Sequence, residues 1–295
     1  MSTLSQKIDF AVVLRVRNAN PNGDPLSGNR PRTDYSGIGE ITDVCLKRKI
    51  RDRLVERWQS LEGKEQDGQA IYVQSDDRKV DDYRCLRDRA EATLANASGV
   101  DDTVALACRT WIDVRAFGQL FAFPKKGGKA KKKEDGDDQG GDTGVSIPIR
   151  GPVTVQSAFS LAPVSVTSTQ ITKSASNEGD GSKRGSDTMG LKHRVDGGIY
   201  VFKGSMNPQL AGRTGFSDQD AEIFKTILPR LFENDASSAR PEGSMEVLKV
   251  VWWTHGCKAG RLSSAKVHDS LTVAEDGSVS VGALPGIEMS ILDGF

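Results

Sequence analysis

The fold is decided by residues 18–58, which read N-A-N-P-N-G-D-P-L-S-G-N-R-P-R-T-D-Y-S-G-I-G-E-I-T-D-V-C-L-K-R-K-I-R-D-R-L-V-E-R-W. The first part, residues 18–39, holds four Gly, three Pro and four Asn. Gly reaches backbone angles that other residues avoid, and Pro stiffens the path of the chain. Long loops are uncommon in compact domains and are often functional. We therefore predict a functional loop here, followed by a basic helix.

The helix is predicted to begin at Thr42, whose hydroxyl can cap the first free backbone N–H groups. Between positions 47 and 57 it carries six basic residues and two acidic ones. Lys47 and Arg51 fall among the apolar positions, where a helix that needed only a wet face would not place cations. Cations near a positive helix end suit phosphate oxygens, and a solvated basic face is the alternative. The basic residues are Lys47, Arg48, Lys49, Arg51, Arg53 and Arg57.

Residues 8–17 are predicted to form a central strand, because apolar residues occupy both alternating faces at its start. One face then becomes basic, through Arg15 and Arg17, where the strand meets the loop. Arg17 therefore joins the predicted binding residues.

The composition is that of an ordinary globular protein. The 295 residues include 37% apolar residues, and 40 Lys and Arg balance 40 Asp and Glu. A zero net charge excludes a uniformly basic nucleic-acid binder, so any phosphate contact must come from local clustering. Four dispersed cysteines without a C-x-x-C pair argue against a zinc site or a disulfide framework. No apolar run suggests a leader or a membrane span, so we expect a cytoplasmic protein with no membrane partner.

Residues 59–100 are charge-rich and helical in pattern, with a helix expected over 85–97, and we interpret them as an insertion. Asp76, Asp77, Asp81 and Asp82 could bind a divalent metal. Acids at helix starts and in solvated turns are the favoured interpretation.

Two further segments follow the insertion. Within 105–123, Asp113 and Arg115 are two positions apart, so on a strand they would share a face and pair as a buried structural ion pair. Residues 124–144 hold lysines, then acids, with many glycines, and are predicted to be a disordered surface loop.

A projecting hairpin is predicted over 164–195. Strand-like segments at 164–172 and 191–203 flank a polar, Gly-rich tip. The arms carry the candidate contact residues Lys173, Lys192, His193 and Arg194.

The C-terminal part is predicted to supply the rest of the core. Residues 216–232 have helical spacing after the cap Ser217. Residues 246–254 form a buried strand in which Trp252 and Trp253 point to opposite faces. Short strands are expected at 267–273 and 287–291.

Catalytic chemistry is not predicted. There is no phosphate-binding loop of the G-x-x-x-x-G-K-[ST] type. His255, Cys257 and His268 could make a three-ligand metal site, but their spacing matches no standard pattern. His193 is the one candidate general base near a basic segment, and a binding role is the simpler interpretation. We therefore predict no catalytic residue, no metal site and no cofactor.

Four motifs together resemble the Csd-two family, the Cas-seven superfamily backbone subunits of the type I-C CRISPR surveillance complex, Cascade. The resemblance extends from position 8 to about 273. The motifs are residues 18–25 (N-A-N-P-N-G-D-P), 39–52 (G-E-I-T-D-V-C-L-K-R-K-I-R-D), 113–118 (D-V-R-A-F-G) and 149–153 (I-R-G-P-V) with Gln156.

The resemblance implies an α+β fold. It would be one modified RRM-like (ferredoxin-like) palm over 1–295, with helical fingers at 59–100, the loop at 124–144 and a β-hairpin thumb at 164–195. One departure is that no aromatic RNP signature lies on a strand, so base stacking on the sheet is not expected.

The resemblance also implies a non-catalytic role. Several copies would line one CRISPR guide RNA, with target DNA paired to it, beside the end-capping, large and small Cascade subunits. The loop and first helix would hold guide phosphates, and each thumb would displace a base. Carried onto this sequence, the contacts are Asn20, Asn22, Lys47, Arg48, Lys49, Arg51 and Gln156, with Lys173, Met189, Lys192 and His193 in the thumb and Met189 as a candidate wedge.

Two alternatives remain at this point. An endoribonuclease on the same palm would act on CRISPR RNA or target through His193, the acids at 76–82, or the thumb-tip residues Asp180 and Asp187. A protein-only tube would form the same polymer without nucleic acid.

Overall fold

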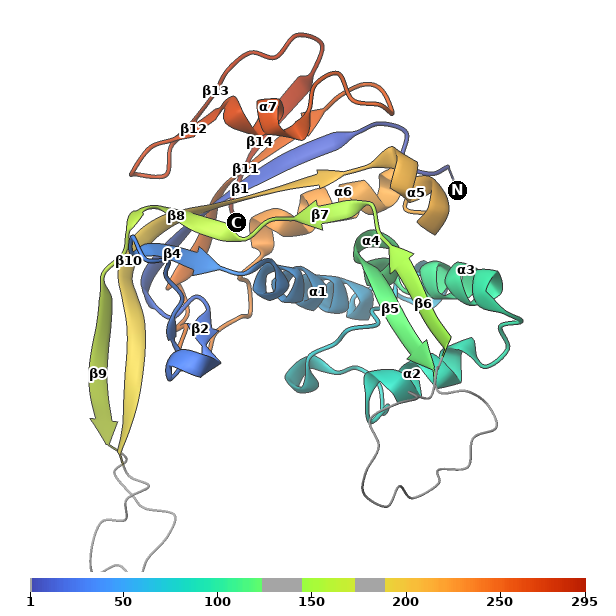
Figure 1. Cartoon of the computed structure of the whole chain (residues 1–295), viewed down its shortest axis with the longest axis horizontal. Helices are drawn as coiled ribbons and strands as arrows, with labels where there is room; N and C mark the ends of the chain where they lie inside the picture. Colours follow the sequence, from blue (N-terminus) through green and yellow to red (C-terminus); the bar gives the residue numbers. More distant parts are fainter. Residues whose placement is uncertain (1, 124–144, 173–188) are drawn as a thin grey trace, which may run out of the picture.

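The computed structural model describes residues 2–123, 145–172 and 189–295. An antiparallel sheet runs in the order β14-β11-β1-β10-β8-β4, with β7 and β9 also paired to β10, and three two-stranded sheets accompany it (Figure 1). The strands are β1 Ile8–Ala19, β2 Gly23–Asp24, β3 Arg30–Pro31, β4 Ile38–Ile41, β5 Gly118–Phe123, β6 Val145–Arg150, β7 Val153–Val155, β8 Ala158–Pro163, β9 Val166–Thr172, β10 Met189–Met206, β11 Met245–Thr254, β12 Leu271–Val273, β13 Val279–Val281 and β14 Glu288–Asp293.

Most helices lie against this sheet or beside it. The α-helices are α1 Asp43–Gln59, α2 Leu86–Leu94, α3 Val100–Thr110, α4 Ile112–Phe117, α5 Pro208–Thr214, α6 Asp218–Ile227 and α7 Ser264–Asp269. The short 3-10 helices are η1 Pro25–Ser27, η2 Gly63–Gln66, η3 Asp76–Arg78 and η5 Leu228–Arg230. No described helix is long and apolar enough to cross a membrane.

Strand β1 is the centre of the sheet, which confirms the prediction for residues 8–17. It pairs with β10 on one side and β11 on the other. Phe10 and Val12 face one side and Ala11 and Val13 the other, and all four side chains are wholly buried.

The main core lies between one face of the sheet and helices α1, α5 and α6. Leu46 and Ile50 of α1 pack in the same cluster as Phe10 of β1 and Phe224 of α6. Burying each such side chain contributes roughly 1.5–3 kcal/mol. The predicted start of α1 is confirmed, because the Thr42 hydroxyl accepts a hydrogen bond from the Cys45 N–H at 3.3 Å.

The other face of the sheet is covered by α7 and the β12–β13 ribbon. Trp252 stacks on Phe10 in the main core, at 5.8 Å between ring centroids, while Trp253 packs with Val267 on the opposite face, as the strand period predicted. The strand expected over 267–273 is wrong at its start. Val267 lies in α7, because Ser263 caps a helix there, and the strand β12 begins only afterwards.

Helices α2, α3 and α4 and the β5–β6 ribbon share a second small core of aromatic residues. Tyr72 and Trp111 lie 4.8 Å apart between ring centroids, and Phe121 of β5 packs on both. The insertion expected at 59–100 is thus part of a larger helical region, since α3 and α4 continue it to Phe117.

The strand and mutual pair expected for Asp113 and Arg115 are wrong. Both residues lie in helix α4, and each pairs with a residue far away in the sequence, Arg51 and Asp220 respectively. Tertiary partners have overridden the local strand preference. Both residues are nevertheless buried and ion-paired, as the favoured interpretation predicted.

Strand β9 and the first part of β10 form the hairpin predicted over 164–195. The register runs from Thr172 opposite Met189 to Val166 opposite Val195. Figure 1 shows this hairpin projecting from the sheet, away from α3 and α5. The tract 124–144 and the hairpin tip with Lys173, Asp180 and Asp187 lie outside the described residues.

Candidate nucleic-acid interface

The loop between β1 and β4 is closed by Asn20. Its side chain is 4% exposed, and its amide donates to the carbonyl of Asn29 at 2.7 Å. Its backbone N–H donates to the carbonyl of Ala239 at 2.9 Å. Asn20 is thus buried and shapes the loop, and its contact with RNA stays a prediction.

The loop is docked on the start of helix α1 through Asn22. The side-chain oxygen Oδ1 of Asn22 accepts hydrogen bonds from both the backbone N–H and the hydroxyl of Thr42, at 3.0 and 2.9 Å. The exposed Gln156 lies two residues before Ala158, which pairs with Ile41 directly before Thr42. Asn22 thus contacts the cap of α1, and Gln156 lies close in sequence to the strand pair that precedes this cap.

Two of the α1 cations that were predicted to bind phosphate already have internal partners. Lys49 is 3% exposed and pairs with Asp235, and burial lowers the pKa of its ammonium group. Arg51 donates to the buried Asp113 at 2.9 Å and lies over the ring of Phe117. Buried charges need such partners. Lys49 and Arg51 therefore serve the fold in this conformation.

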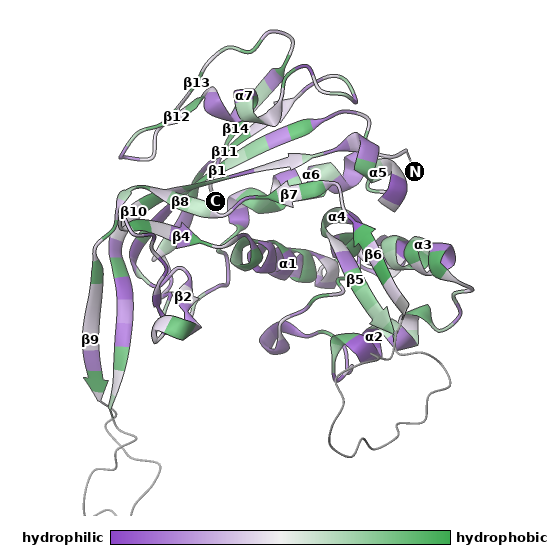
Figure 2. Cartoon of the chain, viewed as in Figure 1, coloured by the Kyte–Doolittle hydropathy of each residue, from purple (hydrophilic) through white to green (hydrophobic). Residues whose placement is uncertain are grey.

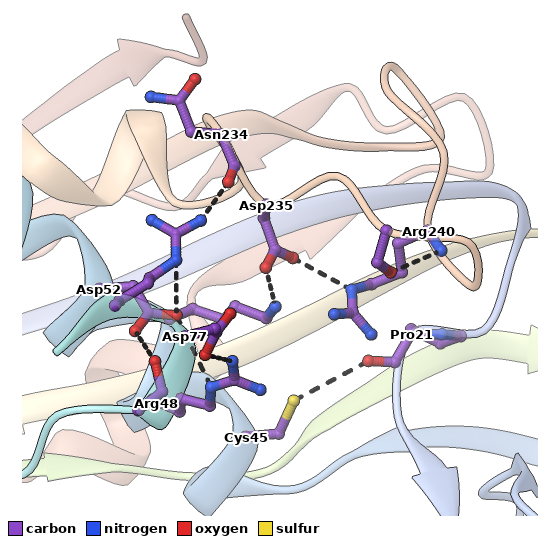
Figure 3. A network of polar contacts seen from close by, with 12 residues as sticks. Pro21, Cys45, Arg48, Asp52, Asp77, Asn234, Asp235 and Arg240 are labelled. Carbon is purple, nitrogen blue, oxygen red and sulfur yellow. Dashed lines mark hydrogen bonds and ion pairs between the residues drawn. The ribbon is translucent and has the colours of Figure 1, made fainter.

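Figure 3 shows the charged network that continues from α1 to the loop after η5. Asp235 accepts a hydrogen bond from Arg240 Nε at 3.1 Å and forms an ion pair with Lys49. Burial raises the pKa of Asp52, the carboxylate next to Arg48 in this network. Because the carbonyl of Ala239, beside Arg240, accepts the N–H of Asn20, the network also positions the loop between β1 and β4.

Lys47 and Arg48 keep accessible surface. Lys47 is half-buried and pairs with Asp43 at 2.9 Å, on the first two turns of the helix. The Arg48 side chain is 47% exposed and lies 3.4 Å from Asp77 and 3.7 Å from Asp52. Exposed pairs of this kind are weak, so both cations can exchange a carboxylate for a phosphate at small cost.

The loop and the hairpin meet at one hydroxyl. Ser168 Oγ lies 2.8 Å from His193 Nδ1 and accepts a hydrogen bond from Arg30 Nη1, also at 2.8 Å. Since arginine can only donate, the hydroxyl proton of Ser168 is available to His193. His193 is 8% exposed and joins the two strands of the hairpin through Ser168, while Arg30 joins the same hydroxyl to the loop.

The hairpin has two chemically different faces. Met189 and His193 lie on one face, whereas Lys192 and Arg194 lie on the other, because side chains alternate along a strand. Met189 is 67% exposed, and Lys192 and Arg194 are also exposed. The predicted thumb residues therefore lie on opposite faces of the hairpin.

Sequence reasoning missed two cations in the loop. Arg30 reaches the hairpin as described, and Arg32 lies 3.2 Å from Asp24. The R-P-R spacing inside the polar loop was the available signal. Arg17, which was predicted, is exposed at the end of β1, and its backbone N–H donates to the carbonyl of Ser244 at 2.8 Å.

The other candidate groups are engaged elsewhere. Asp81 binds the guanidinium of Arg89 through two hydrogen bonds, at 2.7 and 2.8 Å. His255 lies 2.7 Å from the buried carboxylate of Asp9, and His268 lies 3.2 Å from the carbonyl of Gly204. Within 2–123, 145–172 and 189–295, no three His, Cys, Asp or Glu side chains gather as metal ligands.

A family model and a curated relative that match this chain carry the same family description. The family model for CRISPR-associated protein Cas7 matches residues 6–283. A curated relative from Haloferax volcanii, described as CRISPR-associated protein Cas7, is 27% identical over 314 residues, which cover 99% of this chain and 82% of the relative.

Two solved structures resemble the chain more distantly. A chain of a "CRISPR RNA-guided surveillance complex, pre-nicking" aligns over 84% of this chain and 78% of its own, with 14% identity and a TM-score of 0.46. A chain of a "CRISPR RNA-guided surveillance complex" aligns over 84% and 68%, with 15% identity and a TM-score of 0.40. Both TM-scores are below 0.5, so neither resemblance carries an inference.

Proposed function

Because the chain belongs to the CRISPR-associated Cas7 family, we propose that it is an RNA-binding backbone subunit. In this proposal several copies line one CRISPR guide RNA and hold its phosphates without reading its sequence. Phosphate contacts carry no sequence information, so one protein can coat any guide. Target choice is then left to base pairing between the guide and DNA.

The finer assignment is the backbone subunit of a type I-C Cascade, built on an RRM-like palm. The strand order β11-β1-β10-β8, with α1 and α6 against one face, supports the palm. The motifs at 18–25 and 39–52 support the subtype. The β9–β10 hairpin takes the place of the thumb, and α2 to α4 that of the fingers.

One observation carries the proposal: side-chain hydrogen bonds fasten the loop at Asn22 and at Arg30, and cations stay exposed around it. Asn22 docks it on α1 and Arg30 joins it to the hairpin through Ser168. Arg17, Arg48 and Lys192 remain exposed around this path. A pre-ordered loop loses less entropy on binding a ribose-phosphate chain than a free one would.

The hairpin faces suggest a division of labour. Lys192 and Arg194 present positive charge for a phosphate chain, whereas Met189 presents an apolar side chain that can wedge between bases. We do not expect RNA bases to stack on the sheet, because the aromatic residues of β1 and β11 are buried.

We infer no catalysis and no cofactor. His193 is occupied by Ser168, and the carboxylate of Asp81 is occupied by Arg89. The partners in this proposal are the guide RNA, target DNA paired to it, neighbouring copies and the other Cascade subunits. The setting would be the cytoplasm.

The test is charge reversal of exposed residues that bear little on stability. Arg17→Glu with Lys192→Glu should lower guide RNA retention about tenfold or more, because two phosphate contacts become repulsive. Retention is measured by the ratio of absorbance at two wavelengths after purification and by fluorescence anisotropy with labelled RNA. Wild type should bind two unrelated RNA sequences equally.

The matched control is Lys258→Glu with Lys266→Glu, two exposed cations of the C-terminal region. It has the same charge change and should bind as wild type does. Equal RNA retention by both double variants would refute the proposed surface. Purified polymer without nucleic acid would favour the protein-only tube, and magnesium-dependent cleavage of labelled RNA would favour the nuclease.

A further inference from the structure

A cleft with charged residues in its lining lies on the other side of the molecule from the hairpin. It has a volume of about 490 Å³ and opens where α3 and α4 meet the junction of α5 and α6. Figure 1 places α3 and α5 at the side of the molecule away from the β9–β10 hairpin. The lining residues are Asp67, Gly68, Gln69, Ala105, Cys108, Arg109, Arg115, Arg213, Thr214, Gly215, Ser217 and Asp220.

The floor of this cleft is rigid and electrically balanced. Arg115 is 7% exposed and binds Asp220 through two hydrogen bonds, at 2.9 and 2.7 Å. It also donates to the carbonyls of Gly68 and Cys108. Asp220 in turn accepts the Ser217 N–H at 2.9 Å in the capping box of α6. The floor therefore has a fixed shape and adds little net charge.

The rim of the cleft is positive. Arg109 and Arg213 are exposed, and neither has a carboxylate partner among the residues that the structure describes. Asp67 is the one acid of the lining that the floor does not neutralise. Burial raises the pKa of the Cys108 thiol to about 11, so it stays uncharged at neutral pH. An anionic group suits this rim.

Two glycines with positive φ angles shape the backbone that lines the cleft. Gly68 has a φ of +71°, and a side chain there would lie 2.7 Å from the carbonyl oxygen of Arg109. Gly215 ends α5 with a φ of +79°. Each glycine allows a backbone path that other residues would strain, so the cleft exists before any ligand arrives.

The lining chemistry favours a polypeptide over a nucleic acid. No aromatic side chain lines the cleft, so it offers no surface for base stacking. It presents acceptors as well as donors, through Asp67, Gln69 and Thr214. A peptide backbone matches both kinds of group, whereas a phosphate chain offers acceptors alone and is repelled by Asp67.

We propose that this cleft binds an acidic peptide segment of a partner protein, with a carboxylate held between Arg109 and Arg213 over the Arg115–Asp220 floor. Planar guanidinium groups bind carboxylates through paired hydrogen bonds. The site does not use the RNA surface, so the two proposals stand or fall separately.

The experiment measures binding of a fluorescein-labelled, end-capped hexaglutamate peptide to the full chain by anisotropy at low ionic strength. Arg109→Glu with Arg213→Glu should weaken binding by at least about tenfold. Arg84→Glu with Arg87→Glu, which reverses two exposed arginines near the start of α2, is the matched control and should bind as wild type does. Arg109→Gln with Arg213→Gln is a milder second variant, expected to weaken binding by a smaller factor.

Three results would overturn the proposal. One is absence of peptide binding by wild type. Another is equal binding by the wild type and the Arg109 and Arg213 variants, once thermal melting shows that they fold. The third is displacement of the peptide by an abasic ribose-phosphate oligomer more readily than by unlabelled hexaglutamate, which would assign the cleft to nucleic acid. RNA retention by the same variants should remain at the wild-type level.

Discussion

At the scale of single residues, the carboxylate of Asp113 joins three parts of the fold. It is wholly buried and accepts the N–H groups of Tyr72 and Val73 at 2.7 and 3.1 Å. It also binds Arg51 of α1 at 2.9 Å. A buried charge is tolerated only with such a set of partners, so each group in the set depends on the others.

Asp113→Asn should therefore lower the free energy of unfolding by about 3 kcal/mol, because Arg51 is left without an anionic partner in a poorly solvated place. Urea denaturation measures this. Asp82→Asn, at an exposed carboxylate, should change it by less than about 0.5 kcal/mol. A loss for Asp113→Asn no larger than that of the control would contradict the proposed role.

A second buried carboxylate, Asp9, holds the C-terminal region on the sheet. It lies 2.7 Å from Nε2 of His255, whose Nδ1 accepts the N–H of Arg261 at 3.0 Å. His268 lies on the other side of it, at 3.9 Å, and contacts the carbonyl of Gly204. The Lys7 ammonium is 3.4 Å from the same carboxylate. These contacts join the C-terminal region to the central strand β1.

Stability should fall in mild acid through His268. Burial lowers the pKa of this imidazole below 6.5, although Asp9 and the Gly204 carbonyl act in the opposite direction. Below pH 6.5 the unfolded chain then binds more protons than the folded one. The stabilisation is therefore complete above pH 6.5 and is lost as the pH falls toward the lowered folded pKa. Thermal melts between pH 8 and 5.5 measure the loss.

His268→Asn is the companion variant, because it cannot titrate. It should be less stable overall at neutral pH but should show a shallower fall in melting temperature between pH 7 and 5.5. An unchanged pH profile would mean that other groups cause the acid loss.

At the scale of elements, helix α6 begins with a reciprocal cap that also holds helix α4. Ser217 Oγ accepts the N–H of Asp220 at 3.1 Å, and the Asp220 carboxylate accepts the Ser217 N–H. The same carboxylate binds Arg115 of α4. The Asp220 side chain thus caps the start of α6 and also joins α6 to α4.

Substitutions of the two capping residues, Ser217 and Asp220, should lower the free energy of unfolding by different amounts. Ser217→Ala should lower the free energy of unfolding by about 1 kcal/mol, the usual value of an N-cap. Asp220→Asn should cost about 3 kcal/mol, because it also leaves Arg115 buried without a charge partner. Chemical denaturation of both variants gives the comparison, and equal losses would show that the Arg115 pair adds nothing.

At the scale of the whole molecule, the positive charges are balanced by negative ones but are clustered locally. The chain has no net charge, yet Arg17, Arg30 and Lys192 stay exposed near one loop and hairpin. Lys49 and Arg51, by contrast, form ion pairs with internal carboxylates. RNA affinity should therefore depend on a few local contacts.

The salt dependence of RNA affinity measures the number of those contacts. For single strands, log K falls against log salt concentration by about 0.7 per phosphate neutralised. Arg17→Glu with Lys192→Glu should make this slope shallower by about 1.4, as measured by anisotropy over a salt series. Lys258→Glu with Lys266→Glu should leave the slope unchanged, and equal slopes for all three proteins would contradict the assigned surface.

Local patterns in the sequence predicted the elements themselves. The central strand β1, the Thr42 and Ser217 caps, the opposed Trp252 and Trp253 and the projecting hairpin were all expected, and the structure has them. Each follows from a period or a cap that a few neighbouring residues contain, so no distant partner is needed to recognise it.

What the sequence alone determined, then, is most of the strands and helices and where a polar loop and basic helix adjoin. Only the tertiary structure decided which of the cations are free to bind. Arg51 meets Asp113 across 62 positions and Arg115 meets Asp220 across 105, and the second contact accompanies a helix where a strand was expected. The reason is physical: the cost of burying a charge depends on its neighbours in space, which a local pattern does not contain.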